Sequence, residues 1–597
     1  MLGYLVLGLV KLFNLFLLLT CITAIFVSGA ELDVGIIYKV IANWKQFSKM
    51  ASSPEEMNTM QTIYGTYFVI LAIIIWINYL RQKTTAQYIS LSTRKPIGKR
   101  KIFQWATWYM VYLLGALLIR PLWPYSNMSK YVLFKFIAAP WTDRVSSWGI
   151  SNTEPDAFFK TDNVDLPIEK VSDFSFLQRT NTSEIKNVLW FTFESARAEV
   201  YPFNYNSTFA KRVLTEKAMS ERKITPFMDE FVKECSIATG ASTAASYTIK
   251  SILAMQCSMY PYPSDFISED ERAYYKTCLP THMKQNGFAS IFMEPCTVFD
   301  KLDRVLAKMN MSMYGKEEID KEFKNGAPYD PVNYFGYGDD VMLDRMFAWI
   351  EKKVESKVPF YFSSITNTNH HPWNSPKGWE KQDFAKEEFH MSNNYLNTVA
   401  YTDTMIKKVV DYLKKKGIAN ETLLIINGDH GSAFGEQGMV GTTNRLAVTF
   451  KVPLILWTDN EKWKPLLKNR KLLGDRTTMD ILPTILDVLN DKFTPNTRFD
   501  YGYEGDSLVH PPIDKPRFGF SNPGLRAIQV REKDMKMSID SSGYTSVYNL
   551  KTDPDESNPL DLNTYQGGKY SKWHERARAL IGQKIRELEK AYGPVNL

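Results

Sequence analysis

The 597-residue sequence has few cysteines, little net charge and no low-complexity tract. Five cysteines in a chain of this length exclude a small disulfide-dense scaffold, and no two of them form the CxxC pair of a zinc knuckle. A net charge of +7, from 72 basic and 65 acidic residues, gives no reason to expect a nucleic-acid partner. Because 44% of the residues are hydrophobic, the chain is predicted to fold around a large core.

The N-terminal part contains three long uncharged hydrophobic runs, at residues 12–28, 62–80 and 103–119. Each has about the length that crosses a hydrocarbon core of roughly 30 Å. The second and third runs are predicted to be transmembrane helices. The first ends in the small residues of Val27–Ala30, and the pattern leaves open whether it is an anchor or a cleaved signal peptide. Residues 1–125 are therefore expected to form a membrane region with three spans.

The connector between the second and third runs predicts the orientation in the membrane. Residues 81–101 carry seven Lys or Arg and no Asp or Glu. Basic connectors stay in the cytoplasm, so the chain after about Arg120 is expected in the lumen or outside the cell. The Asn-x-Ser/Thr sequons all fall on that side, as glycosylation requires: Asn127, Asn181, Asn206, Asn310 and Asn420.

The cysteine positions agree with an oxidising compartment. Cys21 lies in the first hydrophobic run, whereas Cys235, Cys257, Cys278 and Cys296 fall within one short part of the chain beyond the predicted spans. Four cysteines allow three pairings, and we expect two disulfides in this region. Of the three pairings, we favour one in which Cys257 is bonded to Cys278.

From Phe174 onward, short apolar runs alternate with helical stretches. The runs predict strands at Asn187–Thr192, Phe288–Met293, Val358–Ile365, Thr422–Ile426 and Val452–Trp457. The stretches predict helices at Pro226–Cys235, Asp339–Lys353, Asn394–Lys415 and Asp480–Leu489, with a peripheral helix at Tyr570–Tyr592. This alternation is typical of an α/β fold with a mainly parallel central sheet covered on both faces. Such sheets bind ligands beyond the carboxyl ends of their strands.

Two of the predicted strands end in residues that carry chemistry. The first strand is followed by Glu194 and Arg197, and the strand beginning at Thr422 is followed by Asp429 and His430. Carboxylates and an imidazole at one edge of a sheet suit a divalent ion such as Zn²⁺ or Mn²⁺, with Mg²⁺ and Ca²⁺ as alternatives. The pattern therefore predicts a site for one divalent metal ion.

The segment Ala238–Ser246 places hydroxyls beside small residues, where a helix can begin and point its N–H groups at an anion. A hydroxyl bound to a metal ion loses its proton more readily and can attack an ester. These features together predict ester cleavage through a covalent intermediate.

The chain from about Lys186 to Asn563 resembles the sulfatase-type branch of the alkaline phosphatase superfamily. The resemblance rests on the order and spacing of eight segments: Asn187–Ser195, Ile224–Glu234, Gly240–Ser246, Thr366–Trp373, Tyr401–Gly417, Leu423–Gly438, Thr477–Leu489 and Val547–Leu562. The C/S-x-P-x-R motif that arylsulfatases convert to formylglycine is not present at Ser242–Ser246. The segment looks more like the threonine motif of lipoteichoic acid synthases and lipid A phosphoethanolamine transferases. Those enzymes also carry a sulfatase-fold domain on transmembrane helices and transfer a phospho-alcohol group through a phosphothreonine.

The resemblance implies a role for individual residues. Thr243 would be the nucleophile, and it would share one metal ion with Glu194, Asp429 and His430. His370 would contact the substrate phosphate or the leaving group. Weaker candidates for substrate binding are Arg197, Lys250 and His371, and Glu436 and Lys250 are equally compatible with solvated surface charges. Ser242, Thr239 and Thr248 remain alternatives to Thr243 as the reacting hydroxyl.

The sequence departs from the family pattern at two places. No histidine stands near Thr442, where phosphoethanolamine transferases have one after the Asp-His-Gly motif, so one stable metal ion is expected. The phosphoglycerol-binding residues of lipoteichoic acid synthases are not recognisable near Glu294–Phe299, so the donor of the transferred group cannot be inferred from the resemblance.

The resemblance implies an α/β sandwich of the alkaline phosphatase and sulfatase type, preceded by transmembrane helices. The expected parts are the membrane region (1–125), a juxtamembrane linker (126–185), a catalytic domain (186–565) and a C-terminal helix (566–597). The expected activity is metal-dependent cleavage or transfer of phosphate or sulfate ester groups through a covalent threonine intermediate, with phosphodiester or phospho-alcohol substrates preferred. The candidate carriers of the phospho- or sulfo-ester are a lipid and a glycan. The alternatives are a sulfuric ester hydrolase in the strict sense and an inactive surface protein that kept the fold. An integral membrane protein with a lumenal or extracellular catalytic domain is expected.

Overall fold

The computed structural model describes residues 184–592, except 239–240, 262–276, 324–326, 334, 443, 473, 492–500, 522–526, 541–544 and 561–570. The predicted spans at 12–28, 62–80 and 103–119 and the linker up to residue 183 lie outside the described residues. Within the described part, no helix combines the length and the apolar character that a membrane crossing requires.

An eight-stranded sheet forms the centre of this part, in the strand order β10-β2-β9-β6-β1-β5-β3-β4. The bounds are β1 (Asn187–Phe193), β2 (Ser236–Ala238), β3 (Ala289–Met293), β4 (Ser312–Tyr314), β5 (Phe360–Ile365), β6 (Thr422–Gly428), β9 (Leu454–Trp457) and β10 (Arg470–Lys471). All five predicted strands are present, with ends shifted by up to two residues. β9 pairs antiparallel with β2 and β6, while the other neighbours pair in parallel, so the sheet is mixed and mainly parallel.

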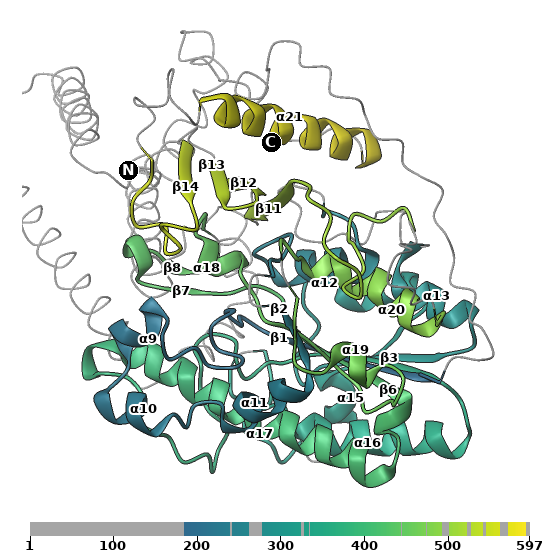
Figure 1. Cartoon of the computed structure of the whole chain (residues 1–597). Helices are drawn as coiled ribbons and strands as arrows, with labels where there is room; N and C mark the ends of the chain where they lie inside the picture. The colour runs from purple at the N-terminus through teal and green to yellow at the C-terminus, as the bar shows by residue number, and fades with distance from the viewer. Residues whose placement is uncertain are drawn as a thin grey trace, which may run out of the picture. The chain divides into compact units, whose positions relative to one another are not determined.

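Helices cover both faces of this sheet (Figure 1). One face, with Leu189 and Phe191 of β1, packs in a core with α9 (Thr208–Val213), α11 (Pro226–Phe231), α16 (Asp340–Glu355) and α17 (His390–Lys416). The other face, with Val188 and Trp190, packs with α12 (Thr248–Cys257), α13 (Leu279–Gln285), α14 (Leu302–Lys308), α19 (Lys464–Leu467) and α20 (Ile481–Leu489). β1 is buried along its whole length because both of its faces are covered, as the continuous apolar run Asn187–Phe193 requires.

Short elements connect the long ones. They are α10 (Glu216–Glu221), α15 (Lys316–Lys321), α18 (Ala447–Phe450) and the 3₁₀ turns η4 (Val232–Glu234), η6 (Glu387–Phe389), η7 (Ala419–Glu421), η8 (Glu436–Gly438) and η9 (Thr478–Asp480). The helix predicted at Pro226–Cys235 is thus α11 followed by η4. A two-stranded antiparallel ribbon is formed by β7 (Ala433–Phe434) and β8 (Val440–Gly441).

A second, four-stranded antiparallel sheet follows the central one in sequence and was not predicted. Its strands are β11 (Arg517–Ser521), β12 (Ala527–Glu532), β13 (Met535–Asp540) and β14 (Thr545–Asn549), paired in chain order. The predicted C-terminal helix is present as α21 (Ser571–Tyr592) and lies across these strands in Figure 1. Ala577 and Ile581 of α21 pack in one core with Val530 of β12.

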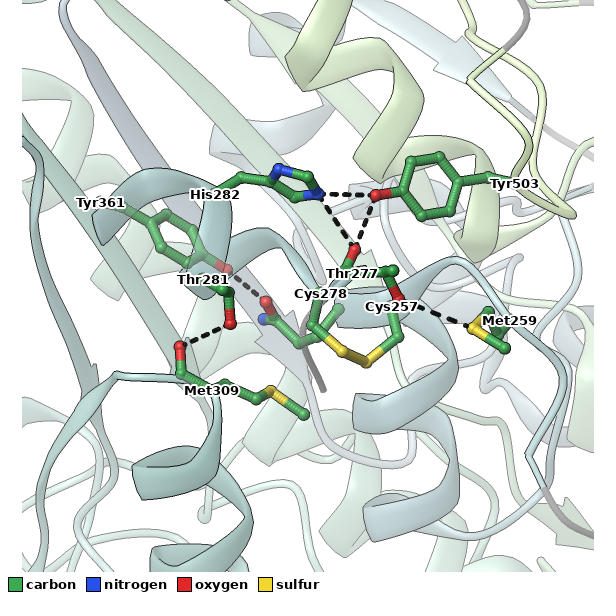
Figure 2. The surroundings of a disulfide bond; sticks show 10 residues. Cys257, Met259, Thr277, Cys278, Thr281, His282, Met309, Tyr361 and Tyr503 are labelled. Carbon is green, nitrogen blue, oxygen red and sulfur yellow. Dashed lines mark hydrogen bonds between the residues drawn. A yellow bond between two sulfur atoms is a disulfide. The ribbon is translucent and has the colours of Figure 1, made fainter. Parts of the chain in front are cut away.

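A disulfide joins Cys257, the last residue of α12, to Cys278, which caps α13 (Figure 2). The predicted Cys257–Cys278 pairing is therefore present. Beside the disulfide, His282 Nε2 lies 2.7 Å from the Tyr503 hydroxyl oxygen, and that hydroxyl donates to the Thr277 carbonyl oxygen. These bonds fix the end of α12 that is opposite its first residue, Thr248.

The second predicted disulfide is wrong, because Cys235 and Cys296 are buried free thiols. Cys235 immediately precedes β2 and Cys296 follows β3, and these two strands are five positions apart in the sheet. Strands are spaced about 4.8 Å apart, so roughly 24 Å separates the two strands. A disulfide requires Cα atoms within about 7 Å of each other, and the sheet keeps these two cysteines too far apart.

Candidate metal centre

Glu194, Asp429 and His430 meet at the carboxyl ends of two neighbouring parallel strands. Phe193 of β1 pairs with Gly428 of β6, so the residues that follow each strand are brought side by side. One ligand atom from each of the three side chains lies within 4.8 Å of the others. Their exposures are 4%, 0% and 3% for Glu194, Asp429 and His430, so the cluster is enclosed by protein.

The backbone around the cluster orients the two carboxylates. Ser195 adopts a left-handed conformation (φ 54°), which turns its N–H toward Asp429 Oδ1 at 2.9 Å. The His430 N–H also donates to Asp429 Oδ1, at 2.7 Å. The Ser195 hydroxyl donates to Glu194 Oε1 at 2.8 Å. Asp429 is thus held through one oxygen, while its Oδ2 has no hydrogen-bond partner among the described residues.

The His430 ring presents its second nitrogen to the same centre. Nδ1 lies 3.1 Å from the Gly431 carbonyl oxygen, and a carbonyl only accepts, so Nδ1 carries the proton. The lone pair of Nε2 is then directed to the cluster, where Nε2 lies 3.2 Å from Asp429 Oδ2. Burial lowers the pKa of His430, which keeps the imidazole neutral, as a metal ligand must be.

The charges of the cluster favour a cation. Burial and the neighbouring Glu194 carboxylate raise the pKa of Asp429 well above its ordinary value. Burial acts in the same sense on Glu194, but the His430 and His370 imidazoles and the Ser195 hydroxyl outweigh it and hold the pKa of Glu194 below its usual range. Two buried carboxyls at adjacent strand ends and one open carboxylate oxygen are the arrangement that a divalent ion stabilises. The residues present therefore fit one such ion, with mixed oxygen and nitrogen ligands.

Thr248, the first residue of α12, brings its hydroxyl to this cluster. The hydroxyl donates to Glu194 Oε2 at 3.1 Å, and its oxygen lies 3.3 Å from His430 Nε2. Thr248 is also partly exposed, whereas the three ligand residues are buried. Thr248 therefore supplies a hydroxyl that contacts two of the predicted metal ligands.

Thr243, the nucleophile expected from the sequence, lies in the segment that leads into α12. Its hydroxyl is 3.1 Å from the Ser251 hydroxyl, and the residue is 1% exposed. Of the alternatives to Thr243, Ser242 has its hydroxyl oxygen 3.5 Å from the Arg476 carbonyl oxygen. Thr239 is outside the described residues. The helix begins at Thr248, whereas the sequence predicted a helix start within Ala238–Ser246. For this reason the sequence favoured Thr243 as the reacting hydroxyl and left Thr248 as an alternative.

His370 lies in the loop Thr366–Trp373, which follows β5, the neighbour of β1. Its Nδ1 is 2.8 Å from the His371 carbonyl oxygen, so Nδ1 is the protonated nitrogen. Burial lowers the pKa of His370, and the Glu194 carboxylate partly offsets this. His371 instead packs its ring against Trp373, with ring centroids 4.9 Å apart. Of the two histidines, His370 is the one that interacts electrostatically with both Glu194 and His430.

Buried hydrogen bonds hold the loop that carries His370. The Asp339 carboxylate accepts from the N–H groups of Asn367 at 2.6 Å and Thr368 at 3.1 Å. Thr366 Oγ1 accepts from the Glu194 N–H at 2.9 Å, which ties the loop directly to a candidate metal ligand. Burial raises the pKa of Asp339 to about 6. No local sequence signal marks Thr366 or Asp339, because their partners are more than 25 residues away.

Arg197 and Glu436, two of the weaker candidates, bind each other. The Arg197 guanidinium is buried between Glu199 and Glu436 and lies 4.2 Å from the Phe209 ring centroid. Glu436 also pairs with Arg212 at 2.7 Å, so it is neither solvated nor isolated. These contacts occupy the donors that Arg197 would need for a substrate. Lys250 is 1% exposed within α12 and is likewise not a surface charge.

Comparisons with known proteins agree on one family and one fold. The family model described as Sulfatase matches residues 186–491. The chain is 25% identical to lipoteichoic acid synthase 2 of Bacillus subtilis (strain 168), over 51% of this chain and 45% of that protein. It is 24% identical to lipoteichoic acid synthase 1 of the same organism, over 62% of this chain and 55% of that protein. The chain thus spans about half the length of the curated relatives it matches.

Two solved structures resemble the described part. One is a protein in the alkaline phosphatase superfamily from Vibrio parahaemolyticus, with a TM-score of 0.51 and 17% identity over 73% of this chain and 95% of that chain. The other is the lipoteichoic acid synthase LtaP from Listeria monocytogenes, with a TM-score of 0.50 and 16% identity over 72% of this chain and 98% of that chain. At these identities the comparison establishes the fold, which is alkaline phosphatase-like with a mixed, mainly parallel central sheet.

Proposed function

The chain belongs to the sulfatase family of the alkaline phosphatase superfamily, and on this premise we propose that it cleaves or transfers a phospho-alcohol group through a covalent threonine intermediate. The nucleophile of this proposal is Thr248, in place of the Thr243 expected from the sequence. The observation that carries it is the position of the Thr248 hydroxyl, within 3.3 Å of both Glu194 and His430.

Glu194, Asp429 and His430, together with the Thr248 oxygen, would hold one divalent ion, Zn²⁺ or Mn²⁺ in preference to Mg²⁺ or Ca²⁺. When bound, the ion would lower the pKa of the threonine hydroxyl and neutralise charge that develops on the ester oxygens. The open Asp429 Oδ2 and the His430 Nε2 lone pair would supply two of the ligands.

The chain's own residues position the reacting atoms. The Thr248 hydroxyl donates to Glu194 Oε2, which leaves an oxygen lone pair for attack on phosphorus. In this step the Thr248 hydroxyl proton passes to water as the Thr248 Oγ–P bond forms. The bond from phosphorus to the leaving alcohol breaks, and the leaving oxygen takes up a proton from water. Because Thr248 is the first residue of α12, the positive end of the helix dipole faces the phosphoryl oxygens.

His370 is proposed as the base of the second half-reaction. Burial keeps its ring neutral, and Nδ1 is hydrogen-bonded to the His371 carbonyl, so Nε2 is the nitrogen that can take a proton. It would accept this proton from water in a hydrolase or from an alcohol in a transferase. Both reactions share the step at Thr248, and the site supports either.

Phosphorus is preferred over sulfur because a threonine, and not a formylglycine precursor, contacts the ligands. The names of the B. subtilis relatives support a phospho-alcohol substrate that is lipid-borne. With the three predicted spans, this favours a membrane-anchored enzyme whose catalytic domain is lumenal or extracellular. A sulfuric ester hydrolase is the second candidate, favoured by the description of the matching family. The enclosed ligand set argues against an inactive protein.

The test is a comparison of two isosteric variants of the full-length protein with Mn²⁺ or Zn²⁺. Thr248→Val removes the hydroxyl at the cluster and is expected to abolish turnover of a nitrophenyl phosphodiester. Thr243→Val removes the hydroxyl that is hydrogen-bonded to Ser251, and this variant is expected to keep most of the turnover. Mass spectrometry should find the phospho-alcohol on the peptide that contains Thr248. Turnover by Thr248→Val would overturn the nucleophile assignment, and turnover of nitrophenyl sulfate alone would overturn the preference for phosphorus.

A further inference from the structure

Glu294, which follows β3, is a fully buried carboxyl whose polar neighbour is the weakly donating Cys296 thiol. Its exposure is 0%, and neither Oε1 nor Oε2 accepts from an N–H or O–H group of the described residues. Its backbone is fixed, because the Glu294 N–H donates to the Tyr314 carbonyl oxygen at 3.1 Å. Burying an unpartnered polar group costs on the order of several kcal/mol, so a group from outside the chain is the natural partner of this carboxyl.

Glu294 lies at the same edge of the sheet as the metal centre. The strand order β6-β1-β5-β3 is parallel throughout, so the residues after all four strands meet at one edge. Met293 of β3 pairs with Ser364, and Thr192 of β1 pairs with the next residue, Ile365. Glu294 is thus two strands away from Glu194, or about 10 Å along the edge. The loop with His370 follows β5, the strand between them.

Glu294 also belongs to the same face of the sheet as Glu194. Side chains two residues apart along a strand share a face. Trp190 of β1 and Phe292 of β3 pack in one core with Ile249 of α12. If side chains keep alternating between the two faces of the sheet past the strand ends, both glutamates lie on the face that α12 covers. The hydrogen bond from Thr248 of α12 confirms this for Glu194.

The surroundings of Glu294 tie it to the reaction centre. Burial raises the pKa of Glu294 well above its ordinary value, the Cys296 thiol offsets part of this, and the Glu317 and Glu194 carboxylates add to the rise. The loop after Glu294 is held beside His370, because the Thr297 N–H donates to the Phe335 carbonyl and the Phe335 ring packs edge-on to His370 at 4.6 Å. The loop that follows Glu294 is therefore connected to His370 through Phe335.

We infer that Glu294 binds a hydrogen-bond-donating group, a hydroxyl or an ammonium, on the alcohol that stays bonded to phosphorus during transfer to Thr248. With phosphorus at the cluster, this alcohol extends along the sheet edge past His370, and Glu294 selects alcohols that carry a donor. The inference rests on the proposed function. In the step concerned, the Thr248 Oγ–P bond forms and the P–O bond to the leaving group breaks, while the bond between phosphorus and the selected alcohol is kept.

The experiment uses three 4-nitrophenyl phosphodiesters whose second alcohol is glycerol, ethanolamine or 1-propanol. Release of nitrophenol by the full-length, detergent-solubilised protein with Mn²⁺ reports the transfer to Thr248. The wild type is expected to prefer the glycerol or the ethanolamine ester to the propyl ester by at least about tenfold in kcat/KM. Glu294→Leu should remove this preference and leave the propyl rate unchanged or higher.

A second variant separates the two kinds of donor. Glu294→Gln keeps an acceptor oxygen but cannot ionise when an ammonium group binds beside it. It should therefore keep a preference for the glycerol ester and lose one for the ethanolamine ester. Glu317→Gln is the matched control, because it removes the neighbouring carboxylate without changing the residue after β3. Its preference should equal that of the wild type.

Two results would overturn the inference. If Glu294→Leu slows all three esters equally, or leaves the preference intact, Glu294 has only a structural role. Wild-type protein that is inert on all three esters, the propyl ester included, would refute the proposed function and this inference with it. Turnover of the propyl ester shows that the proposed function holds whatever Glu294 does, so the two failures are distinguishable.

Discussion

The Thr248 hydroxyl donates a hydrogen bond to Glu194 Oε2 at 3.1 Å across a separation of 54 residues. Glu194 is fixed at the end of β1, and Thr248 is fixed at the start of α12, so the bond joins the sheet to the helix that covers it. This relationship places a hydroxyl beside the candidate metal centre.

Metal removal should lower the stability of the catalytic part. An ion that binds only the folded state stabilises it by about 2.7 kcal/mol at 100 times its Kd. We expect chelation by EDTA to lower the Tm and to abolish ester turnover, and Asp429→Asn to make the Tm insensitive to added Mn²⁺. Asp411→Asn on the exposed side of α17 is the control. A wild-type Tm that does not respond to chelation would contradict the binding of a divalent ion at this site.

Arg197 should matter for folding, because its guanidinium is paired with Glu199 and Glu436 while nearly fully buried. Breaking a buried ion pair leaves an uncompensated charge and typically costs about 3–5 kcal/mol. Arg197→Gln should therefore lower the free energy of unfolding by that amount in a urea titration. Lys407→Gln, which breaks the exposed pair with Asp411, should change it by less than about 1 kcal/mol. Equal effects of the two substitutions would argue against the structural role.

The Cys257–Cys278 disulfide should stabilise the segment that carries Thr248. A disulfide that closes a loop of this size contributes about 2–4 kcal/mol. Replacing both cysteines by serine should lower the unfolding free energy by that amount. Alkylation of unfolded, unreduced protein should label Cys235 and Cys296 and spare Cys257 and Cys278, as mass spectrometry can determine. Labelling of Cys257 would disprove the bridge.

His282, beside the disulfide, should make stability depend on pH. Burial lowers its pKa from 6.5 to about 4. Between these values the unfolded chain binds the proton and the folded chain does not, so this contribution to stability is full above about pH 6.5 and is lost as the pH falls toward 4. His282→Gln should flatten the pH dependence of the unfolding free energy in this window. An unchanged slope in the variant would assign the effect to other groups.

Three sequons in the described part test the predicted orientation. Asn206, Asn310 and Asn420 are exposed. In a eukaryotic host, a lumenal catalytic domain should carry N-glycans at these positions, and glycosidase treatment should lower its mass. The Asn→Gln variants at the three positions are the controls. A mass that glycosidase treatment does not change would contradict translocation of this part of the chain.

The sheet and the candidate metal ligands were predictable because their signals are local. Each predicted strand is a continuous apolar run, and Glu194, Asp429 and His430 stand directly after two of those runs. The topology then brings the strand ends together. The antiparallel placement of β9 was not predictable from its run, since an apolar strand reads the same in either direction.

The proposed nucleophile and the second sheet were less predictable from the sequence. Thr243 stands among small residues, whereas Thr248 lies between Tyr247 and Ile249, so the sequence favoured Thr243. The observed start of α12 and the contacts of the Thr248 hydroxyl favour Thr248 instead. β11–β14 carry Arg, Lys and Glu between apolar residues, so they lack the continuous runs of the central sheet. The bond from Tyr395 to the Ser195 carbonyl spans 200 residues and has no local signal.

Gly431, next to His430, has a consequence beyond the metal centre. A Cβ at this position would lie 2.0 Å from the Val448 carbonyl oxygen, so the peptide after the ligand pair is in direct backbone contact with α18. The Gly431 N–H also donates to the Thr449 carbonyl at 2.9 Å. The ligand pair and the α18 turn therefore move as one body, and a molecule that displaced α18 would deform the metal centre without touching it.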